Sequence, residues 1–354
     1  MPEPPTPEPR RLLVLAPNWL GDAVMALPAI ADLRRAFPAA RLAVAARASV
    51  AAVFDLVPGV NEVITLEWTG KTGARAAFRA DVARLKAAAC DTALLLPNSF
   101  ASAWLVYRAR VGRRWGYGRD FRSWLLTRAV AAPEGSRHHA AYYQHLVREL
   151  GVANGPLDAV VDPRAADVAD ARRLLNDRGW DGTSRLVAVA PGAAYGTAKQ
   201  WLPEYFVTLA RTLIESDGAT VVLVGGQGDA VTTAFVRDSL PEPLRARVLD
   251  LAGATSLHVL AGVLSLASAC VSNDSGAMHL AAALGVPVAA IFGATNEHET
   301  SPLTRGRRPL RLLVHPVDCR PCMLRECPID HRCMSRLQPS EVHSAVQDLV
   351  EAGR

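Results

Sequence analysis

The sequence lacks the patterns that mark several large classes of protein. No apolar run is long enough to cross a bilayer as a helix, so we expect no transmembrane segment. Residues 1–10 alternate proline with glutamate and have no apolar stretch of the secretory kind, so they predict a disordered leader on a cytoplasmic protein. Neither a G-x-G-x-x-G fingerprint nor a Walker pattern occurs, which excludes the two commonest phosphate-binding loops.

Apolar residues, by contrast, make up 50% of the 354 residues, a length that suits two domains. Strand-length apolar runs alternate with helical patterns in both halves, which predicts an α/β fold of two Rossmann-like domains with parallel sheets. The candidate strands are 12–16, 42–46, 63–66 and 92–96 in the first half, and 186–190, 220–224, 248–251, 269–272 and 286–292 in the second; 23–36 and 74–89 read as helices.

The same patterns suggest where the domains begin and end. After the leader at 1–10 we expect an N-terminal domain at 11–165, a linker region at 166–184 and a C-terminal domain at 185–338. The tail at 339–354 has an apolar face and a serine near its start, Ser340, which suits an N-cap. It therefore predicts a terminal helix.

The segment PNWLGDAVM, residues 17–25, follows the first candidate strand and leads into a helix. Helix N-termini at such turns often hold a phosphate, because their N–H groups are free and the dipole is positive there. The carboxylate of Asp22 would repel a phosphate, however. On spacing alone, Asp22 is typical of a residue that caps a helix.

In the second half, Lys199 ends a loop of small residues that follows the candidate strand 186–190. Small residues let backbone N–H groups approach a ligand closely, and a lysine supplies a point charge suited to phosphate. A plain connecting loop with a surface lysine is the alternative interpretation.

The segment NDSGAMH, residues 273–279, joins a strand to a helix. Such a helix begins at the carboxyl edge of a parallel sheet, where α/β proteins bind ligands, and the amides of Ser275 and Gly276 would face a diphosphate. Asp274 would either cap the helix or hold sugar hydroxyls. His279 would either donate to the ligand or pack as an ordinary helix residue.

Positive charge gathers in one segment, although the whole chain carries only +5. Residues 101–140 contain eight arginines against two acidic residues, a net charge of +6. This concentration favours an anionic partner such as a phosphorylated lipid, an acidic sugar or a nucleic acid. A solvated arginine-rich surface is the alternative.

Four of the six cysteines, Cys319, Cys322, Cys327 and Cys333, fall in one short stretch. A C-x2-C pair is a common zinc half-site, and four thiolates would complete a tetrahedron. The full spacing matches no standard zinc ribbon or finger, and disulfides are not expected in a reducing compartment. A structural zinc ion, reduced thiols in a compact loop and an iron–sulfur cluster are therefore open alternatives.

Seven segments in order carry a family resemblance: PNWLGDAVMALPA (17–29), LLLPNSFASAW (94–104), GYGRDFRSWLL (116–126), PGAAYGTAKQW (191–201), LVGGQGD (223–229), LAGATSL (251–257) and NDSGAMHLAAALGVP (273–287). Together they resemble the ADP-heptose:lipopolysaccharide heptosyltransferases of glycosyltransferase family 9, and most closely the heptosyltransferase II branch. The resemblance implies a GT-B architecture, with two Rossmann-like domains facing a cleft and the last helix packed back on the N-terminal domain.

The resemblance also implies an activity and its partners. L-glycero-D-manno-heptose would pass from ADP-heptose to the inner core of lipopolysaccharide, with inversion and release of ADP, as the second heptose added. The acceptor would be anionic Kdo–lipid A that is already heptosylated. Contact with the inner membrane would be peripheral, at its cytoplasmic face, and no nucleic acid is implied.

Individual residues match the family's site. Asp22 matches the proposed general base, and Lys199 matches a lysine near the donor phosphates. Ala193 and Ala194 would offer backbone amides to the same phosphates. The remaining implied residues are Asp274, Ser275, Gly276 and His279 for the donor, and Gly21, Arg113, Arg114, Arg119 and Arg122 for the acceptor.

Several alternatives remain open at this stage. No DxD-like acidic pair follows a strand, so we expect catalysis without a metal or other cofactor. A family member with another nucleotide sugar or acceptor, a GT-B sugar-nucleotide epimerase and a non-catalytic sugar-nucleotide or lipopolysaccharide-binding protein are the competing interpretations. Some relatives bind the donor ribose with an acidic residue at the position of Gly226 and Gln227, neither of which is acidic, so ribose recognition stays open.

Overall fold

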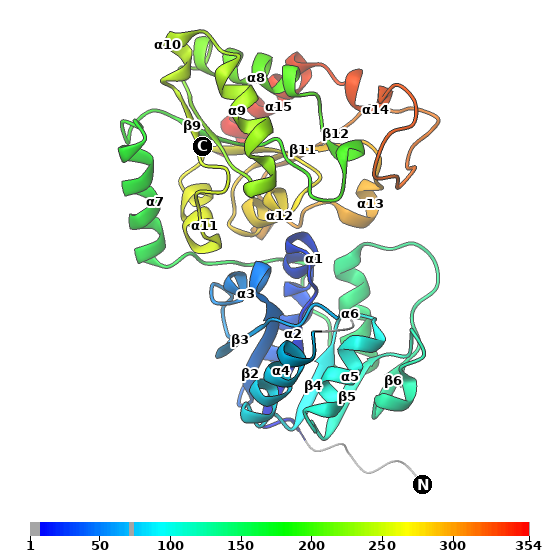
Figure 1. Cartoon of the computed structure of the whole chain (residues 1–354). Helices are drawn as coiled ribbons and strands as arrows, with labels where there is room; N and C mark the ends of the chain where they lie inside the picture. Colours follow the sequence, from blue (N-terminus) through cyan, green and yellow to red (C-terminus); the bar gives the residue numbers. More distant parts are fainter. Residues whose placement is uncertain (1–7, 71–73, 354) are drawn as a thin grey trace. The chain divides into compact units, whose positions relative to one another are not determined.

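The computed structural model describes residues 8–70 and 74–353. The chain divides after Leu157 into two compact units, Met1–Leu157 and Asp158–Arg354 (Figure 1). Residues 1–7 of the predicted leader lie outside the described residues. The division falls earlier than the expected end of the N-terminal domain at residue 165, because the segment that follows Leu157 packs with the second unit.

The strands of the first unit form one parallel sheet in the order β3-β2-β1-β4-β5-β6. They are β1 (Arg11–Leu15), β2 (Arg41–Arg47), β3 (Glu62–Leu66), β4 (Thr92–Leu95), β5 (Arg113–Tyr117) and β6 (Arg128–Val130). The helices are α1 (Leu20–Met25), α2 (Leu27–Ala36), α3 (Ala48–Phe54), α4 (Arg75–Ala87), α5 (Phe100–Arg108), the short 3-10 helix η1 (Ser123–Leu125) and α6 (His139–Glu149).

Both faces of this sheet are covered, which explains why its central strands are apolar without interruption. Leu13 and Leu15 of β1 belong to the core beneath α4 and α5. The alternating residues Leu12 and Val14 are equally buried and point to the opposite face, since side chains alternate along a strand.

The second unit repeats this plan with the sheet order β12-β11-β10-β7-β8-β9, again all parallel. Its strands are β7 (Leu186–Ala190), β8 (Thr220–Leu223), β9 (Val248–Asp250), β10 (Ala269–Asn273), β11 (Val288–Phe292) and β12 (Leu310–Val314). Its longer helices are α7 (Ala165–Asp177), α8 (Pro203–Glu215), α9 (Ala230–Asp238), α11 (Leu257–Ser265), α12 (Gly276–Ala283) and α15 (Pro339–Ala352). Its short helices are η2 (Thr197–Lys199), η3 (Gln227–Asp229), α10 (Glu242–Arg245), α13 (Glu297–Thr300), η4 (Arg305–Arg307) and α14 (Arg332–Ser335).

The region predicted as a linker at 166–184 contains helix α7, which packs closely on α11. A Cβ at Gly262 of α11 would lie 2.4 Å from the carbonyl oxygen of Asp167, so only glycine permits this approach of the two helices. The linker region therefore contributes to the second unit.

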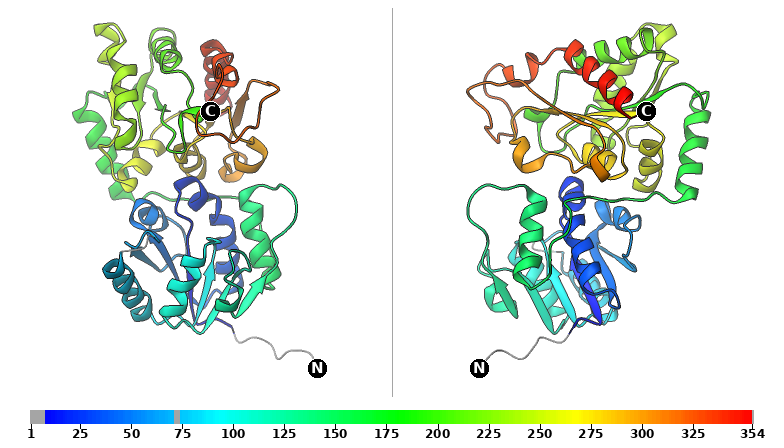
Figure 2. Two further views of the ribbon diagram at one scale, coloured as in Figure 1. Left: turned by 45° about the vertical axis from the view of Figure 1, so that its right-hand side comes forward. Right: turned by 180° about the vertical axis from the view of Figure 1, so that it is seen from behind.

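The predicted terminal helix is present as α15, drawn in red in Figure 2. Its N-cap is Gln338 rather than Ser340, because Pro339 occupies the first helical position and Glu341 accepts a hydrogen bond from the Gln338 amide. Its apolar face, including Val342 and Leu349, belongs to the core of the second unit with α8. The expected packing of this helix on the N-terminal domain stays a prediction.

Every strand predicted from the sequence is present, within two residues at each end. Three strands were missed: β5, β6 and β12. Each of them carries arginine, as in RRWGY and RAV, so none reads as an apolar run. The arginine-rich segment 101–140 is thus part of the sheet and its connections as well as a charged surface.

Strand order positions the site. In each sheet the order reverses between two central neighbours, β1 and β4 in the first unit and β7 and β10 in the second. At such a switch point the loops leave in opposite directions, and open α/β sheets bind ligands there, at the carboxyl ends of the strands. The loops after these four strands are therefore the expected positions of functional side chains.

Candidate active site

In the first unit, helix α1 begins directly after β1 at the switch point and carries both Gly21 and Asp22. Asp22 lies in the first turn of α1, where free N–H groups favour a negative charge. The N-cap residue is Trp19, and its side chain makes no capping hydrogen bond. Asp22 is thus not the N-cap that its spacing suggested, and 27% of its side chain is exposed.

The Asp22 carboxylate has a partner that the sequence analysis missed. Asp22 Oδ1 lies 3.1 Å from His139 Nδ1, at the start of α6. The two residues are 117 positions apart in the chain. The run RHHAAYYQH at 137–145, with its three histidines, was the available signal, but nothing in it indicated which strand edge α6 would reach.

A buried phenol stands near the same carboxylate. Burial raises the pKa of Tyr143 well above its ordinary value, and the negative charge of Asp22 raises it further. Tyr143 therefore stays protonated at neutral pH. The first unit thus brings together a partly exposed carboxylate, an imidazole and a neutral phenol.

In the second unit, the two candidate donor segments meet across the switch point. Lys199 Nζ lies 2.7 Å from Asp274 Oδ2, with side chains 12% and 4% exposed respectively. Thr295, in the loop after β11, also places its hydroxyl 2.5 Å from Asp274 Oδ2. Asp274 is therefore the buried counterion of Lys199, a role not considered from the sequence, and the N-cap of α12 is Ser275. Binding of sugar hydroxyls by Asp274 stays a prediction.

Asn273 connects the two segments through their backbones. Its side-chain amide donates to the carbonyl oxygen of Pro191 at 2.6 Å and accepts from the Trp201 amide at 3.0 Å. Trp201 is fully buried and donates its own indole N–H to the Leu337 carbonyl. These bonds hold the loop that follows β7 in a fixed place beside β10, and Lys199 with it.

Helix α12 begins at the edge of β10 with Ser275 as its N-cap. The Ser275 side chain makes no capping hydrogen bond and instead contacts Ser272 Oγ at 3.0 Å. The N-terminus of α12, which starts at Gly276, therefore has no side-chain cap to compete with an anion. His279 is buried within α12, with 3% exposure, as expected for a packed helix residue.

The loop after β7 brings in an acidic residue that sequence reasoning overlooked. A Cβ on Gly192 would lie 2.0 Å from Asp229 Oδ1, so the missing side chain makes room for this carboxylate. Asp229 ends η3, after strand β8, and also accepts from the Gly226 amide at 2.8 Å. In the same loop Ala193 is buried, whereas Ala194 is exposed.

The structure corrects one of the four arginines predicted to contact the acceptor. Arg122 is completely buried, and it donates to carbonyl oxygens of Tyr117 and Pro97 and to the hydroxyl of Ser102. Burial lowers its pKa to about 10. Arg122 therefore ties together the loops after β4 and β5 and has no surface with which to meet an acceptor.

The other three arginines differ in how far their charge is engaged. Arg113 pairs with Asp91 at 2.5 Å. Arg114 donates to the carbonyl oxygens of Leu125 and Val111 at 2.7 and 2.6 Å and is half-buried. Arg119 is exposed in the loop after β5.

The cysteine segment packs directly on the Lys199 loop. The Ala198 amide donates to the Arg325 carbonyl at 2.9 Å, and the Ala198 carbonyl lies 3.1 Å from His331 Nε2. The Tyr195 hydroxyl donates to the Met323 carbonyl at 2.8 Å. The loop between Cys319 and Cys333 thus supports η2 from outside.

The four thiols do not assemble as a metal site. Cys333 is buried, Cys327 half-buried, and Cys319 and Cys322 exposed. Burial raises the pKa of Cys333, and the charges of Cys319, Cys327 and Cys322 raise it further. Across residues 8–70 and 74–353, however, no three His, Cys, Asp or Glu side chains are grouped so as to hold a metal ion.

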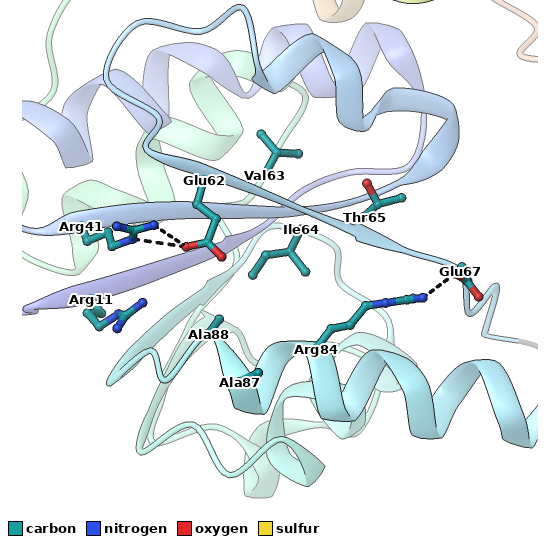
Figure 3. Close-up of a pocket in the computed structure, with 10 residues that line it drawn as sticks. All are labelled: Arg11, Arg41, Glu62, Val63, Ile64, Thr65, Glu67, Arg84, Ala87 and Ala88. Atoms are coloured by element: carbon teal, nitrogen blue, oxygen red, sulfur yellow. Dashed lines mark hydrogen bonds and ion pairs between the residues drawn. The ribbon is translucent and has the colours of Figure 1, made fainter.

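A hollow of about 610 Å³ lies elsewhere in the first unit (Figure 3). It is lined by the amino ends of β1 and β2, by β3 along its length and by the end of α4. Ion pairs between Arg41 and Glu62 and between Arg84 and Glu67 occupy its walls. Four of its five charged side chains are thus paired with one another, and none of its lining residues lies in a loop at the switch point, so it is not the candidate site.

A family model described as glycosyltransferase family 9 (heptosyltransferase) matches residues 79–332. This chain belongs to glycosyltransferase family 9. It is a glycosyltransferase, as the resemblance of its seven segments predicted.

Relatives in this family cover most of the chain. It is 30% identical over 309 residues to the lipopolysaccharide heptosyltransferase 2 of Salmonella typhimurium, which covers 86% of this chain and 88% of that protein. The lipooligosaccharide heptosyltransferase 2 of Haemophilus ducreyi is 29% identical over 311 residues, covering 86% of this chain and 89% of that protein.

Solved structures agree on the architecture. The ADP-heptose lps heptosyltransferase II of Escherichia coli matches with a TM-score of 0.82 and 26% identity, covering 96% of this chain and 98% of that one. The E. coli heptosyltransferase WaaC with ADP shares the fold at a TM-score of 0.72 and 20% identity, covering 97% and 100%. The predicted α/β fold of GT-B type, with two Rossmann-like units, is therefore confirmed.

Among the described residues of this family 9 enzyme, no helix combines the length and the apolar character needed to span a bilayer.

Proposed function

We propose that this glycosyltransferase moves L-glycero-D-manno-heptose from ADP-heptose to the inner core of lipopolysaccharide, and that it adds the second heptose. The observation that carries the proposal is the similarity to heptosyltransferase 2 proteins over 86% of the chain, combined with the paired Lys199 and Asp274 at the switch point. No observation favours an epimerase or a non-catalytic binding protein over this activity.

The second unit, with the predicted bounds 185–338, is the proposed donor domain. The diphosphate would lie against the uncapped N-terminus of α12 at Gly276 and accept from amides of Ala193 and Ala194. Lys199 would share its charge between Asp274 and the phosphates, which stabilises the departing ADP. These residues act through charge and backbone amides, so the donor chemistry needs no cofactor from the chain. Asp229, held against Gly192, is the proposed partner of the donor ribose, since acidic residues after the second strand of such folds bind ribose hydroxyls.

The first unit, with the predicted bounds 11–165, is the proposed acceptor domain, and Asp22 is its base. The acceptor hydroxyl would give its proton to Asp22 while its oxygen attacks the anomeric carbon on the face opposite ADP. The bond from that carbon to the phosphate oxygen breaks, ADP leaves with the electron pair, and the configuration inverts. His139 would hold the Asp22 carboxylate in place through the 3.1 Å contact between His139 Nδ1 and Asp22 Oδ1, with Nδ1 as the hydrogen-bond donor.

The acceptor is anionic, and the proposed contacts to it are Gly21, Arg113, Arg114 and Arg119. Arg119 has the most exposed position of the three arginines and is the first to test. Added salt would weaken the binding of the acceptor's carboxylates and phosphates by these arginines, because it screens the charges. We also propose that the enzyme is cytoplasmic and contacts the inner membrane peripherally, where a heptosylated Kdo–lipid A acceptor is anchored.

Zinc at the four cysteines is a separate question. As described, the thiols do not fit a tetrahedral zinc site, and no catalytic step is assigned to a metal there. We therefore propose four reduced thiols in a compact loop, the alternative to a structural zinc ion that the sequence left open. Metal analysis of protein purified without chelator would decide between bound zinc and four reduced thiols.

The experiment that tests the function follows ADP release from ADP-heptose by the purified protein with defined core acceptors. We expect release only with an acceptor that already carries one heptose on Kdo–lipid A. Asp22→Asn should abolish release while leaving ADP affinity unchanged, since the base and the donor residues belong to different units. Asp177→Asn, an exposed carboxylate at the end of α7, is the matched control. Normal turnover by Asp22→Asn would remove the base assignment, and release with any acceptor or none would remove the proposed function.

A further inference from the structure

Helix α5 and the turn after β5 carry a cluster of exposed aromatic side chains. Phe100, Trp104, Tyr107 and Trp124 form a closed ring of contacts, with successive ring centroids 6.4, 5.7, 6.4 and 6.2 Å apart. Trp124 is 66% exposed, and Tyr107 and Phe100 are 42% and 38% exposed. Helix α5 packs beside β5 and η1 in the first unit (Figure 1). Aromatic residues are only 6% of the chain, so their concentration on one surface needs an explanation.

A fifth ring is presented on a costly turn. Asp120 and Phe121 both adopt left-handed backbone conformations, with φ of 54° and 52°, a region that residues other than glycine rarely adopt. The Asp120 carboxylate fastens the turn to α5 by accepting from the Phe100 amide at 2.5 Å. The outcome is a phenylalanine, Phe121, that is 93% exposed beside the start of α5. Nothing in folding alone rewards a strained turn that places an aromatic ring in water.

Arginines surround these rings. The Arg108 guanidinium lies 5.2 Å from the Trp104 ring centroid, and that of Arg114 lies 5.4 Å from the Tyr107 ring. Arg110 is exposed at the end of α5. Between residues 99 and 130 the sequence holds seven arginines and a single acidic residue, Asp120, whose carboxylate is engaged by a backbone amide. The surface is therefore both aromatic and strongly cationic.

We propose that this surface, the aromatic–arginine patch of Phe100, Tyr107, Arg108, Arg110, Phe121 and Trp124, binds the interface of an anionic lipid bilayer. The proposal rests on the peripheral membrane contact proposed above, and it assigns that contact to these residues. Tryptophan and tyrosine side chains are enriched at the level of lipid headgroups, because the apolar part of the ring contacts the acyl chains while its N–H or O–H group stays hydrated. Arginine keeps its charge in the headgroups while its stem covers apolar surface, and an anionic leaflet attracts it.

Charge and shape together favour a lipid bilayer over a protein as the binding partner of the patch. A protein partner for a cationic aromatic surface would supply acidic side chains at defined places, whereas a bilayer supplies a continuous sheet of anionic headgroups over an apolar layer. Protruding rings of the kind that Phe121 presents suit insertion between headgroups. The patch also lies on the unit proposed to hold the lipid-anchored acceptor, so docking would bring the Asp22 half of the site to the membrane surface.

The test is co-sedimentation of the full chain with vesicles of phosphatidylcholine containing about one-third phosphatidylglycerol, without any lipopolysaccharide. We expect binding to these vesicles, little binding to phosphatidylcholine alone, and weakening as salt rises from about 50 to 500 mM. The variant Phe121→Ser/Trp124→Ser should reduce binding by about tenfold or more. Val231→Ser/Phe235→Ser, which removes two exposed apolar side chains from α9, is the matched control and should bind as the wild type does.

A second variant, Arg108→Gln/Arg110→Gln, tests the charge separately and should abolish the preference for phosphatidylglycerol. Both patch variants should keep ADP release with a soluble, delipidated heptosylated acceptor, which reports the proposed function independently of membranes. Vesicle binding that is unchanged in both patch variants would overturn the patch. Loss of a wild-type dimer in Phe121→Ser/Trp124→Ser, with vesicle binding intact, would also overturn it and identify a self-association surface. Vesicle binding without any ADP release would leave the patch standing and refute the proposed activity.

Discussion

The buried pair of Lys199 and Asp274 gives the sharpest prediction about how the donor half is built. Their charged atoms are 2.7 Å apart, and the two side chains are 12% and 4% exposed. Water can replace little of the missing partner at that depth. Removing one charge therefore leaves the other buried and uncompensated, which costs about 3–5 kcal/mol of unfolding free energy in buried pairs. We expect losses in this range for Lys199→Met and for Asp274→Asn.

The double variant Lys199→Met/Asp274→Asn separates the pair from its surroundings. Because no charge is then left uncompensated, we expect it to cost less than the sum of the single changes by about 2–3 kcal/mol. The assay is urea unfolding followed by circular dichroism, with ADP affinity measured by calorimetry on the same samples. The two variants that lack Lys199 should bind ADP at least about tenfold more weakly, since Lys199 is the proposed phosphate contact.

The matched control is the pair of Arg211 and Glu215 on α8, whose side chains are 55% and 49% exposed at 3.1 Å. Glu215→Gln should change the unfolding free energy by no more than about 0.5 kcal/mol, because exposed pairs are worth little in water. If the effects of Lys199→Met and Asp274→Asn were simply additive, or no larger than the Glu215 control, then the pair would not be a coupled buried contact.

Three further predictions concern side chains that the structure places outside direct chemistry. The hydrogen bond from Arg320 lowers the pKa of Glu297 below its ordinary 4.5, so the stabilisation by Glu297 is present above pH 4.5 and lost as pH falls through the lowered pKa. Glu297→Gln should therefore cost about 1–3 kcal/mol of unfolding free energy at pH 7. In urea unfolding below pH 4.5, the difference between the variant and the wild type should close. Burial raises the pKa of Cys270 to about 12, so iodoacetamide near neutral pH should label the exposed Cys322 and leave Cys270 unmodified in peptide mass spectra. Arg122→Met should lower the unfolding free energy by about 3–5 kcal/mol in thermal or urea unfolding, because it leaves buried carbonyl groups without a hydrogen-bond donor. An unchanged unfolding free energy would contradict the buried position of Arg122.

The fold was predictable wherever both faces of a strand are covered. Residues 186–190 form β7 with the predicted bounds, because a doubly covered parallel strand is apolar at every position and needs no context to be recognised. Strand β5 shows the limit. Its sequence RRWGY begins with two arginines. Arg113 forms an ion pair with Asp91, and Arg114 donates hydrogen bonds to backbone carbonyl groups such as that of Leu125. No local pattern reveals those partners.

The same limit applies to the site. The residue types that matter, Asp22, Lys199 and Asp274, stand out in the sequence because their positions after strands and their motif match known enzymes. Their immediate relationships do not. Asp274 looked like a cap or a sugar ligand, and only the parallel pairing of β7 with β10 shows that it neutralises Lys199.

By itself, the sequence determined the two α/β units, most of their strands and the family to which the enzyme belongs, because these depend on local periodicity and on short motifs. Tertiary structure alone decided which side chains meet. His139 reaches Asp22 across 117 residues, and Arg122 turns inward from a segment that reads as a charged surface. The physical reason is that a parallel sheet gathers the ends of distant strands at one edge, so partnerships there depend on strand order, which no local pattern encodes.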